Sequence, residues 1–274
     1  MQEDRGKKRI TDKSEMILVI VIIAALTVFI ATGVMLIGVI REYKAGEDAY
    51  DNMKQYTQSV PEETSDNSQA SSVTGETDAE QNTEDTSLKA PVQVDFAALQ
   101  KVNEDIVGWI YVEALPEVSY PIVKGEDNTY YLKRTAEKKK NKAASIFMDY
   151  RNNVDFTDAM TVLYGHNMKD GTMFGDLKEY QSGDAYKTSP YIWILTPDKT
   201  YRYEIFSVRD VDEQDSLYAL DLQPGEMQKV YMEDAKKKSD IETTMSFTGE
   251  EKLLTLSTCT KKDTVRLIVQ AAEK

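Results

Sequence analysis

The sequence predicts a mostly β domain with helical insertions, either a barrel or a sandwich, behind a membrane-spanning helix. Two observations predict this class. A long apolar run lies near the N-terminus, and the C-terminal two thirds contain short runs rich in β-branched and aromatic residues. Because these runs follow one another with few helical segments between them, a barrel or sandwich is favoured over a repeated strand–helix–strand unit.

The apolar run covers residues 16–40 and contains no charge. As a helix it would be about 37 Å long, which exceeds the ~30 Å hydrocarbon core of a bilayer, so we expect it to span the membrane. A cleaved signal peptide is the alternative, but its apolar core is usually only about 7 to 15 residues long. More Lys and Arg residues precede the run than follow it, which predicts a cytoplasmic segment at 1–15 and an extracellular C-terminal region.

Residues 41–91 are predicted to be an acidic, disordered extracellular linker. No basic residue lies between Lys54 and Lys89, whereas eight acidic residues are interleaved there with Ser, Thr, Gln and Asn. Such a composition cannot bury enough apolar surface to fold. We therefore expect a flexible spacer between the membrane and one folded domain at 92–274, which is long enough for a well-buried core.

Eight runs within that domain are predicted strands. They lie near residues 110, 121, 146, 163, 193, 205, 255 and 267, and read GWIYV, SYPIV, ASIFM, TVLYG, YIWIL, YRYEIFSV, LLTLS and VRLIV. Helical signals are fewer: Asp95 is expected to cap FAALQKV, Thr172 to open MFGDLKEY, and GEMQKVYMEDAKKKS has a helix-forming composition.

Composition removes several classes of function. The formal net charge is -14 and no basic stripe is present, which argues against a nucleic-acid partner. One Cys and one His make a zinc site improbable, and no Gly-rich phosphate loop or pair of metal ligands is present. We therefore expect neither a metal nor another cofactor.

Three residues carry candidate chemistry: His166 after one predicted strand, Cys259 at the end of another, and Arg266 in the run that follows. A free thiol has a pKa near 8.5, so a nucleophilic Cys needs a partner that favours its thiolate. His166 is the only imidazole, and the guanidinium of Arg266 has the donors to hold a carbonyl or an oxyanion. Taken singly, each also has an ordinary explanation as core, loop or surface residue.

The wording of these segments resembles the sortase family, class B in particular. TLSTC, residues 255–259, resembles the family's cysteine motif, and ASIFMDYRNNVDF with LYGHNMKDGTMFGDL resembles its histidine region. KVNEDIVGWIYV, SYPIV and DNTYYL are similar to the start of its catalytic domain. The resemblance covers nearly all of residues 95–272.

The resemblance implies a closed β-barrel of about eight strands, with a helix-bearing insertion at 222–239 before the cysteine strand. It also implies Cys259 as nucleophile, His166 as general acid and base, and Arg266 as the stabiliser of substrate and oxyanion. Tyr164 and Ser257 would line the substrate groove and Thr258 would sit beside the oxyanion, although these three can equally be ordinary core or strand residues.

Such enzymes cut a C-terminal sorting motif of secreted proteins after its Thr, hold the fragment as a thioester, and transfer it to an amine of peptidoglycan precursor. The resemblance therefore implies NPxTx-like or SPxTG-like substrates, and pilin polymerisation is an alternative role. Two departures bear on details: only TKKDTV separates Cys259 from Arg266, and EALPE at 113–117 lacks the glycine expected in a family-like turn.

Three rival hypotheses are weaker or differ in kind. An L,D-transpeptidase should have a glycine before its cysteine, where this chain has Thr258. A papain-like hydrolase places its Cys before its His, and here His166 comes first. A stalked, non-enzymatic surface-binding protein fits the anchor and linker equally well, so only the chemistry of Cys259 separates it from the enzyme.

Overall fold

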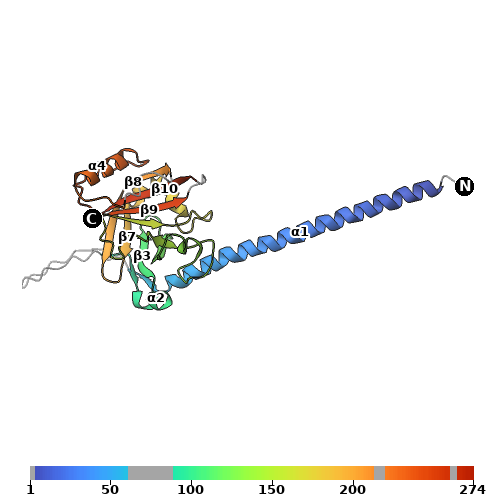
Figure 1. The fold of residues 1–274 in the computed structure, drawn as a ribbon, viewed down its shortest axis with the longest axis horizontal. Helices are drawn as coiled ribbons and strands as arrows, with labels where there is room; N and C mark the ends of the chain where they lie inside the picture. The colour runs from blue at the N-terminus through green and yellow to red at the C-terminus, as the bar shows by residue number, and fades with distance from the viewer. Residues whose placement is uncertain (1–3, 61–88, 213–219, 260–263) are drawn as a thin grey trace, which may run out of the picture. The chain divides into compact units, whose positions relative to one another are not determined.

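The computed structural model of the chain describes residues 4–60, 89–212, 220–259 and 264–274. Within these ranges eight strands form a closed barrel, shown in Figure 1. They are β3 (Ile106–Val112), β4 (Ser119–Lys124), β5 (Ile146–Met148), β6 (Met160–Tyr164), β7 (Tyr191–Leu195), β8 (Thr200–Asp212), β9 (Leu253–Cys259) and β10 (Val265–Glu273). Each coincides with one of the eight predicted runs, which confirms the predicted barrel.

The barrel order is β10-β8-β7-β3-β4-β5-β6-β9. Neighbouring strands are antiparallel except for β4 with β5 and β6 with β9, which are parallel. The β6–β9 pair joins segments about ninety positions apart in the sequence, in a register that sets Met160 against Leu253 and Tyr164 against Ser257. This pairing brings the predicted histidine and cysteine segments to one end of the barrel.

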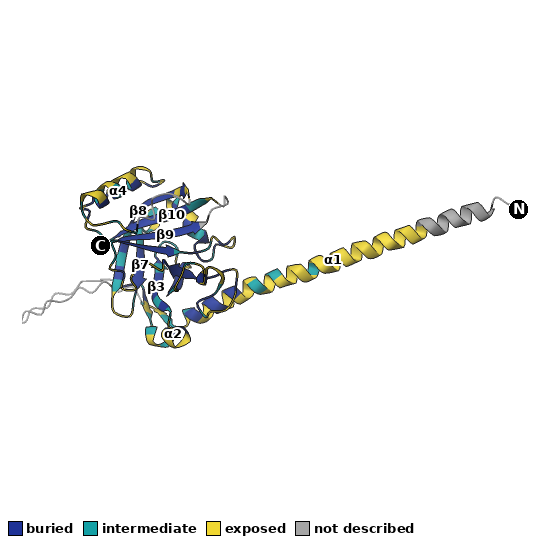
Figure 2. Ribbon diagram, in the orientation of Figure 1, coloured by how far each residue is buried: buried dark blue, intermediate teal, exposed yellow. Residues whose placement is uncertain are grey.

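Side chains alternate between the two faces of the strands, and this separates a core inside the barrel from smaller clusters outside it. The largest buried cluster takes side chains from every barrel strand, Ile110, Ile122 and Leu256 among them, and so fills the barrel. Trp109 and Phe147 belong to a second cluster that includes Leu99 of helix α2 (Phe96–Val102). A third cluster packs strands β6 and β8 against helix α4 (Glu226–Lys237). Figure 2 shows the buried strands and the partly exposed α4.

The helical predictions meet different outcomes. Asp95 caps α2, accepting the Ala98 N–H at 2.9 Å, as expected. Helix α4 lies inside the predicted insertion 222–239, before the cysteine strand. The expected start at Thr172 is wrong, because its N–H and hydroxyl bind the Asp170 carboxylate and Met173 takes a positive φ of 58°. The 3₁₀ helix η2 (Gly175–Tyr180) begins three residues later; the remaining short helices are η1 (Tyr131–Lys133) and α3 (Asp184–Thr188).

Helix α1 (Asp4–Lys54) contains the predicted span and is long and apolar enough to cross a membrane. Side chains of residues 16–40 are almost all exposed, as Figure 2 shows. The chain divides into two compact units, with the boundary between Glu47 and Asp48. The last turns of α1 therefore belong to the same unit as the barrel, where Ala49, Tyr50 and Met53 are buried.

The predicted linker 41–91 is ordered at both ends. Residues 41–54 continue α1, and β1 (Thr57–Ser59) pairs antiparallel with β2 (Val92–Val94). Val60 also donates its N–H to the carbonyl of Pro91 at 2.8 Å. The composition of this segment is polar, but residues near Tyr50 find burial against the barrel, which local composition does not reveal. Residues 61–88 of the predicted linker lie outside the described residues.

Candidate active site

The parallel pair β6–β9 brings two candidate residues to the same end of the barrel. Tyr164, the last residue of β6, is the register partner of Ser257, and Gly165 donates its N–H to the Ser257 carbonyl at 3.1 Å. His166 follows this last contact of β6, and Cys259 ends β9 two residues beyond Ser257. Carboxyl ends of neighbouring parallel strands meet at one edge of a sheet, so His166 and Cys259 leave the barrel beside each other.

Arg266 reaches the same edge through the antiparallel pair β9–β10. Its Cα is the direct register partner of the Cα of Cys259, and directly opposed Cα atoms in such a pair lie about 4.5–5.5 Å apart. The Arg266 side chain is half-buried, and its Nη1 donates to the Val265 carbonyl at 3.2 Å, in addition to at least one other interaction of this residue. Of Cys259 only the backbone position is described, and residues 260–263 lie outside the described ranges.

The half-buried imidazole of His166 is held in place by a hydrogen bond at one of its two ring nitrogens. Its Nε2 lies 2.9 Å from the carbonyl oxygen of Leu132, the middle residue of η1. A carbonyl oxygen can only accept, so Nε2 carries a proton in this contact and Nδ1 is the nitrogen left for proton transfer. The loop after His166 is closed by the Phe174 N–H, which donates to the His166 carbonyl at 3.0 Å.

Gly165, directly before His166, allows the histidine segment to pack closely against Phe174 and Ile146. A Cβ on this residue would lie 2.5 Å from Phe174 Cδ2 and 2.6 Å from Ile146 Cδ1, which is closer than carbon atoms approach. A glycine between Tyr164 and His166 therefore lets the chain leave β6 directly against the core.

The three supporting candidates lie in the same two strands. Tyr164 is half-buried and stacks at a tilt on Phe147, with ring centroids 5.2 Å apart. Ser257 and Thr258 are both buried, at 3% and 2% exposure. Thr258 lies on the same face of β9 as Leu254 and Leu256 of the inner core, and its hydroxyl has no hydrogen-bond partner among the described residues.

Sequence reasoning missed a buried carboxylate beside Tyr164. Asp149 follows β5, has no exposed surface, and accepts the Tyr164 hydroxyl at 3.0 Å and the Asn128 amide at 2.9 Å. Arg151 binds this carboxylate with two hydrogen bonds of 2.9 Å, one from Nε to Oδ1 and one from Nη2 to Oδ2. Burial would raise the pKa of Asp149, but the hydrogen bonds from Arg151 and the neutral donors outweigh it and lower the pKa to about 2.

One signal in the sequence points to this carboxylate. An acidic residue directly after the apolar run SIFM, with an arginine two residues later, is a pattern in which a buried Asp needs a charged partner. The contact with Tyr164 depends on the β5–β6 register, which pairs Phe147 with Tyr164, and so could not be read from the sequence.

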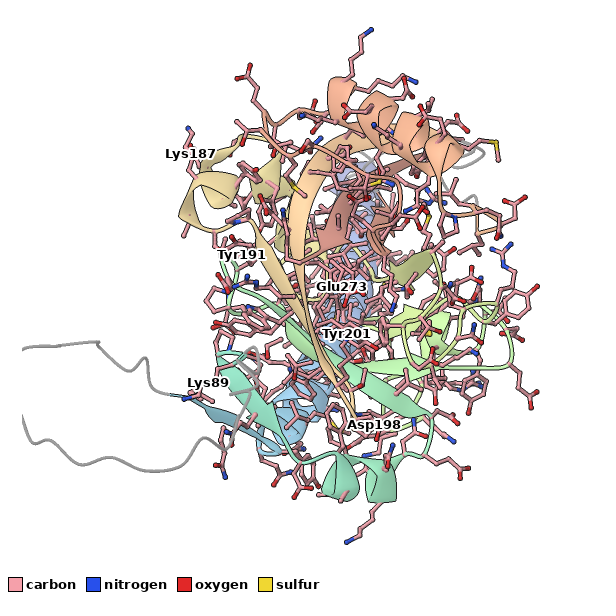
Figure 3. The ribbon with its side chains drawn as sticks, turned by 90° about the vertical axis from the view of Figure 1, so that its left-hand side faces the viewer. Lys89, Lys187, Tyr191, Asp198, Tyr201 and Glu273 are labelled. Atoms are coloured by element: carbon pink, nitrogen blue, oxygen red, sulfur yellow. The ribbon has the colours of Figure 1, made fainter. Side chains whose placement is uncertain are left out.

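Other potential sites are few within the described ranges. No group of three His, Cys, Asp or Glu residues there is placed to hold a metal ion. A cavity of about 480 Å³ lies at the opposite end of the barrel, between α2, the start of β3 and the β7–β8 hairpin. Asp198 and Tyr201 line it, and Figure 3 shows Asp198 at the tip of this hairpin.

Comparison with known proteins gives one consistent family. The model of the sortase domain family matches residues 110–274. Among curated proteins, sortase B of Listeria monocytogenes is 36% identical over 181 residues, covering 65% of this chain and 72% of its own length. Sortase B of Staphylococcus aureus is 31% identical over 183 residues, covering 66% of this chain and 75% of its own length.

Solved structures give the same result. A crystal structure of S. aureus sortase B matches with a TM-score of 0.61 at 31% identity, over 65% of this chain and 86% of that one. Sortase B of Clostridium perfringens matches with a TM-score of 0.60 at 29% identity, over 66% of this chain and all of that one.

Proposed function

Because the chain belongs to the sortase family of cysteine transpeptidases, we propose that it is a membrane-anchored class B enzyme with Cys259 as nucleophile, His166 as general acid and base, and Arg266 as oxyanion stabiliser. The strand register is the observation that carries the proposal. It sets Arg266 opposite Cys259 and brings the end of β6, with His166, alongside the end of β9.

In the first half-reaction the Cys259 thiolate attacks the carbonyl carbon of the threonine in the sorting motif. A C–S bond forms and the carbonyl oxygen becomes an oxyanion, which the Arg266 guanidinium stabilises. As the oxyanion collapses, the C–N bond of the scissile peptide breaks and protonated His166 gives its proton to the leaving amine. The products are a thioester on Cys259 and a free peptide amine.

In the second half-reaction an amine of peptidoglycan precursor attacks the thioester carbonyl. His166, now neutral, takes the proton of the incoming amine, and the C–S bond breaks to release the Cys259 thiolate. With Nε2 bound to the Leu132 carbonyl, Nδ1 is the atom that gives and takes the proton in both steps. Two such steps return the site to its starting state without an external oxidant or reductant.

The substrate is proposed to be a secreted protein with a C-terminal NPxTx-like or SPxTG-like motif. Tyr164 and Ser257 are register partners beside the proposed nucleophile, which supports a groove across the ends of β6 and β9. Thr258 precedes Cys259 and is proposed to border the oxyanion. One of the matching solved structures is a substrate complex of S. aureus sortase B.

The membrane arrangement is also a proposal. Residues 16–40 would span the bilayer, with the N-terminus in the cytoplasm and the barrel outside, because basic residues are more numerous before the span than after it. The proposed span lies wholly within the first of the two units, and the turns of α1 from Asp48 onward belong to the unit that contains the barrel.

The proposal is tested with the full chain in detergent micelles and a panel of fluorogenic peptides of NPxTx, SPxTG and LPxTG type. Glycine, diaminopimelate-type amines and a lysine-containing pilin-like peptide serve as acceptors. We expect cleavage of a Pro-x-Thr peptide, an amine-dependent transfer product, and loss of at least about 10³-fold in kcat/KM for Cys259→Ala and for His166→Ala.

Lys187→Ala is a matched control, because Lys187 is exposed and forms an exposed ion pair with Asp184, three positions before it in the chain. Parental cleavage by Cys259→Ala would contradict the proposed nucleophile, and equal turnover of peptides without a Pro-x-Thr core would contradict the proposed substrate. Preference for the pilin-like acceptor would assign the chain to pilin polymerisation.

A further inference from the structure

The Asp149 carboxylate lies beside Tyr164 and is hydrogen-bonded at both of its oxygens. It has no exposed surface. Both of its oxygens accept hydrogen bonds: Oδ1 from Arg151 Nε and the Arg151 backbone N–H, Oδ2 from Arg151 Nη2, Asn128 and Tyr164, at 2.9 to 3.0 Å. Five donors on one buried carboxylate make a rigid junction.

This junction meets the histidine segment from two directions. Tyr164 lies two residues before His166 on β6, and its hydroxyl ends on Asp149. Asn128 lies on the segment that leads into η1, where the Leu132 carbonyl holds His166 Nε2 at 2.9 Å. Asn128 also accepts the Tyr150 N–H at 3.0 Å, so this segment is tied to the turn after β5 on both sides of its amide.

We propose that Asp149 is a positioning residue for His166, whose carboxylate fixes Tyr164 and the segment 128–132 so that the imidazole keeps Nε2 on Leu132 and offers Nδ1 to Cys259. The inference deepens the proposed function and rests on it, because it assigns Asp149 a role through the general acid and base. Asp149 touches neither substrate nor the reacting atoms in this role.

A carboxylate is required because its donors are one guanidinium, one backbone N–H and two neutral side chains. An amide in its place has a single acceptor oxygen, and its NH₂ group would point at another donor. Tyr164 and Asn128 both bind Oδ2, so the NH₂ of Asp149→Asn faces either these two side chains or the Nε and backbone N–H of Arg151. In either orientation the junction loses at least two of its five hydrogen bonds. The low pKa of Asp149 is consistent with this, since it keeps the group ionised throughout the working range.

Loss of the junction should affect turnover more than binding. A displacement of about 1 Å in a catalytic group can cost about 100-fold in rate. For Asp149→Asn we expect kcat to fall about 10- to 100-fold with KM changed less than about 3-fold. Tyr164→Phe and Asn128→Ala each remove one link, and we expect each to lower kcat about 3- to 10-fold.

The decisive readout is spectroscopic. His166 is the only histidine in the chain, so full-length protein selectively labelled with ¹⁵N-histidine and purified without a histidine tag gives signals from this imidazole alone. In the parent we expect the neutral ring to be predominantly the Nε2–H tautomer. In Asp149→Asn we expect mixed tautomers or exchange broadening, because the Leu132 carbonyl is no longer held in place.

Asp155→Asn is the matched control, because Asp155 is exposed and its carboxylate accepts hydrogen bonds from the N–H and hydroxyl of the nearby Thr157. It should keep the parental kcat and tautomer. Folded Asp149→Asn with parental kcat and tautomer would overturn the inference, as would a rise in KM alone. If Asp149→Asn does not fold, the two single-link variants decide: parental kcat and tautomer in both overturns it.

Failure of the proposed function gives a different pattern. If the parent cleaves no sorting peptide, the transpeptidase proposal fails, whereas the tautomer of His166 still reports on Asp149. A shift of tautomer in Asp149→Asn then supports the positioning role without any catalytic measurement, and an unchanged tautomer overturns it.

Discussion

Two carboxylates of this barrel, Asp149 and Glu273, meet cations in opposite environments. Asp149 is fully buried beside β6 and accepts hydrogen bonds from the Arg151 guanidinium, the Arg151 backbone N–H and two neutral side chains. Glu273 ends β10 and pairs with Lys199 at 3.1 Å and Lys252 at 3.9 Å, where 22% of the Glu273 side chain and 54% of the Lys199 side chain are exposed. Figure 3 shows Glu273 and Tyr201 near each other at this second site.

This difference indicates that the contribution of a charged side chain to stability depends on its burial and its neutral hydrogen-bond partners, rather than on the presence of an ion pair alone. Exposed pairs are typically worth about 0–1 kcal/mol because water and salt screen them. Both oxygens of a buried carboxylate need hydrogen-bond donors. Removing the carboxylate therefore eliminates these hydrogen bonds and leaves the buried donors without an acceptor. We therefore expect Asp149 to matter for stability and Glu273 hardly at all.

The largest expected effect breaks the buried junction outright. Asp149→Ala should lower the free energy of unfolding by about 4 kcal/mol, because the Tyr164 and Asn128 donors lose their acceptor while Arg151 can turn into water. Denaturant unfolding followed by tryptophan fluorescence measures this, since both tryptophans, Trp109 and Trp193, are buried in the barrel. Glu273→Ala is the matched variant; an equal loss in the two would refute the distinction.

The second prediction compares the loss of stability on removing a buried neutral side chain with the loss on removing a buried charged one. Tyr50, on the last turns of α1, is 5% exposed, bonds to the Ala144 carbonyl, and meets Tyr120 edge to face at 5.3 Å. Tyr50→Ala should cost about 3 kcal/mol in the same unfolding experiment. Exposed Asp51→Ala, one position along the helix, is the control. A loss below about 1 kcal/mol for Tyr50→Ala would show that these turns add little to the barrel.

The third effect uses acid to remove the charge without a mutation. The pKa of Asp149 is lowered from 3.8 to about 2 on folding, so the unfolded state binds its proton more readily. Its contribution of about 2 kcal/mol is present above about pH 5 and is lost as the pH falls towards 2. The stability difference between the parent and Asp149→Asn should narrow by that amount over this range. A difference that stays constant with pH would contradict the assigned pKa.

The same distinction explains what the sequence could and could not predict. Strand positions follow from local composition, so all eight predicted runs form barrel strands, and Asp95 caps α2 as expected. The helical end of α1 and the β1–β2 pair depend on burial against the barrel or on a partner about 35 residues away. A polar stretch such as 41–60 therefore looks disordered when only its composition is considered.

For the candidate site, the sequence yields the residue types but not their surroundings. Cys259, His166 and Arg266 are identifiable because each is rare or set in a recognisable segment, whereas their adjacency depends on the β6–β9 and β9–β10 registers. Asp149 lies 15 residues before Tyr164, and only the β5–β6 register makes them neighbours. Their catalytic roles stay predictions until the variants are measured.

The smallest effect is expected for the partly exposed ion pair between Glu273 and Lys199. Glu273→Gln and Lys199→Met each remove one charge that is partly in water, so each should change the free energy of unfolding by less than about 1 kcal/mol and leave kcat/KM at the parental value. High salt should reduce even this difference, because exposed charges are screened over about 10 Å at 0.1 M ionic strength. A loss of peptide cleavage in either variant would show that this end of the barrel, with its cavity lined by Lys199 and Tyr201, is coupled to the proposed site.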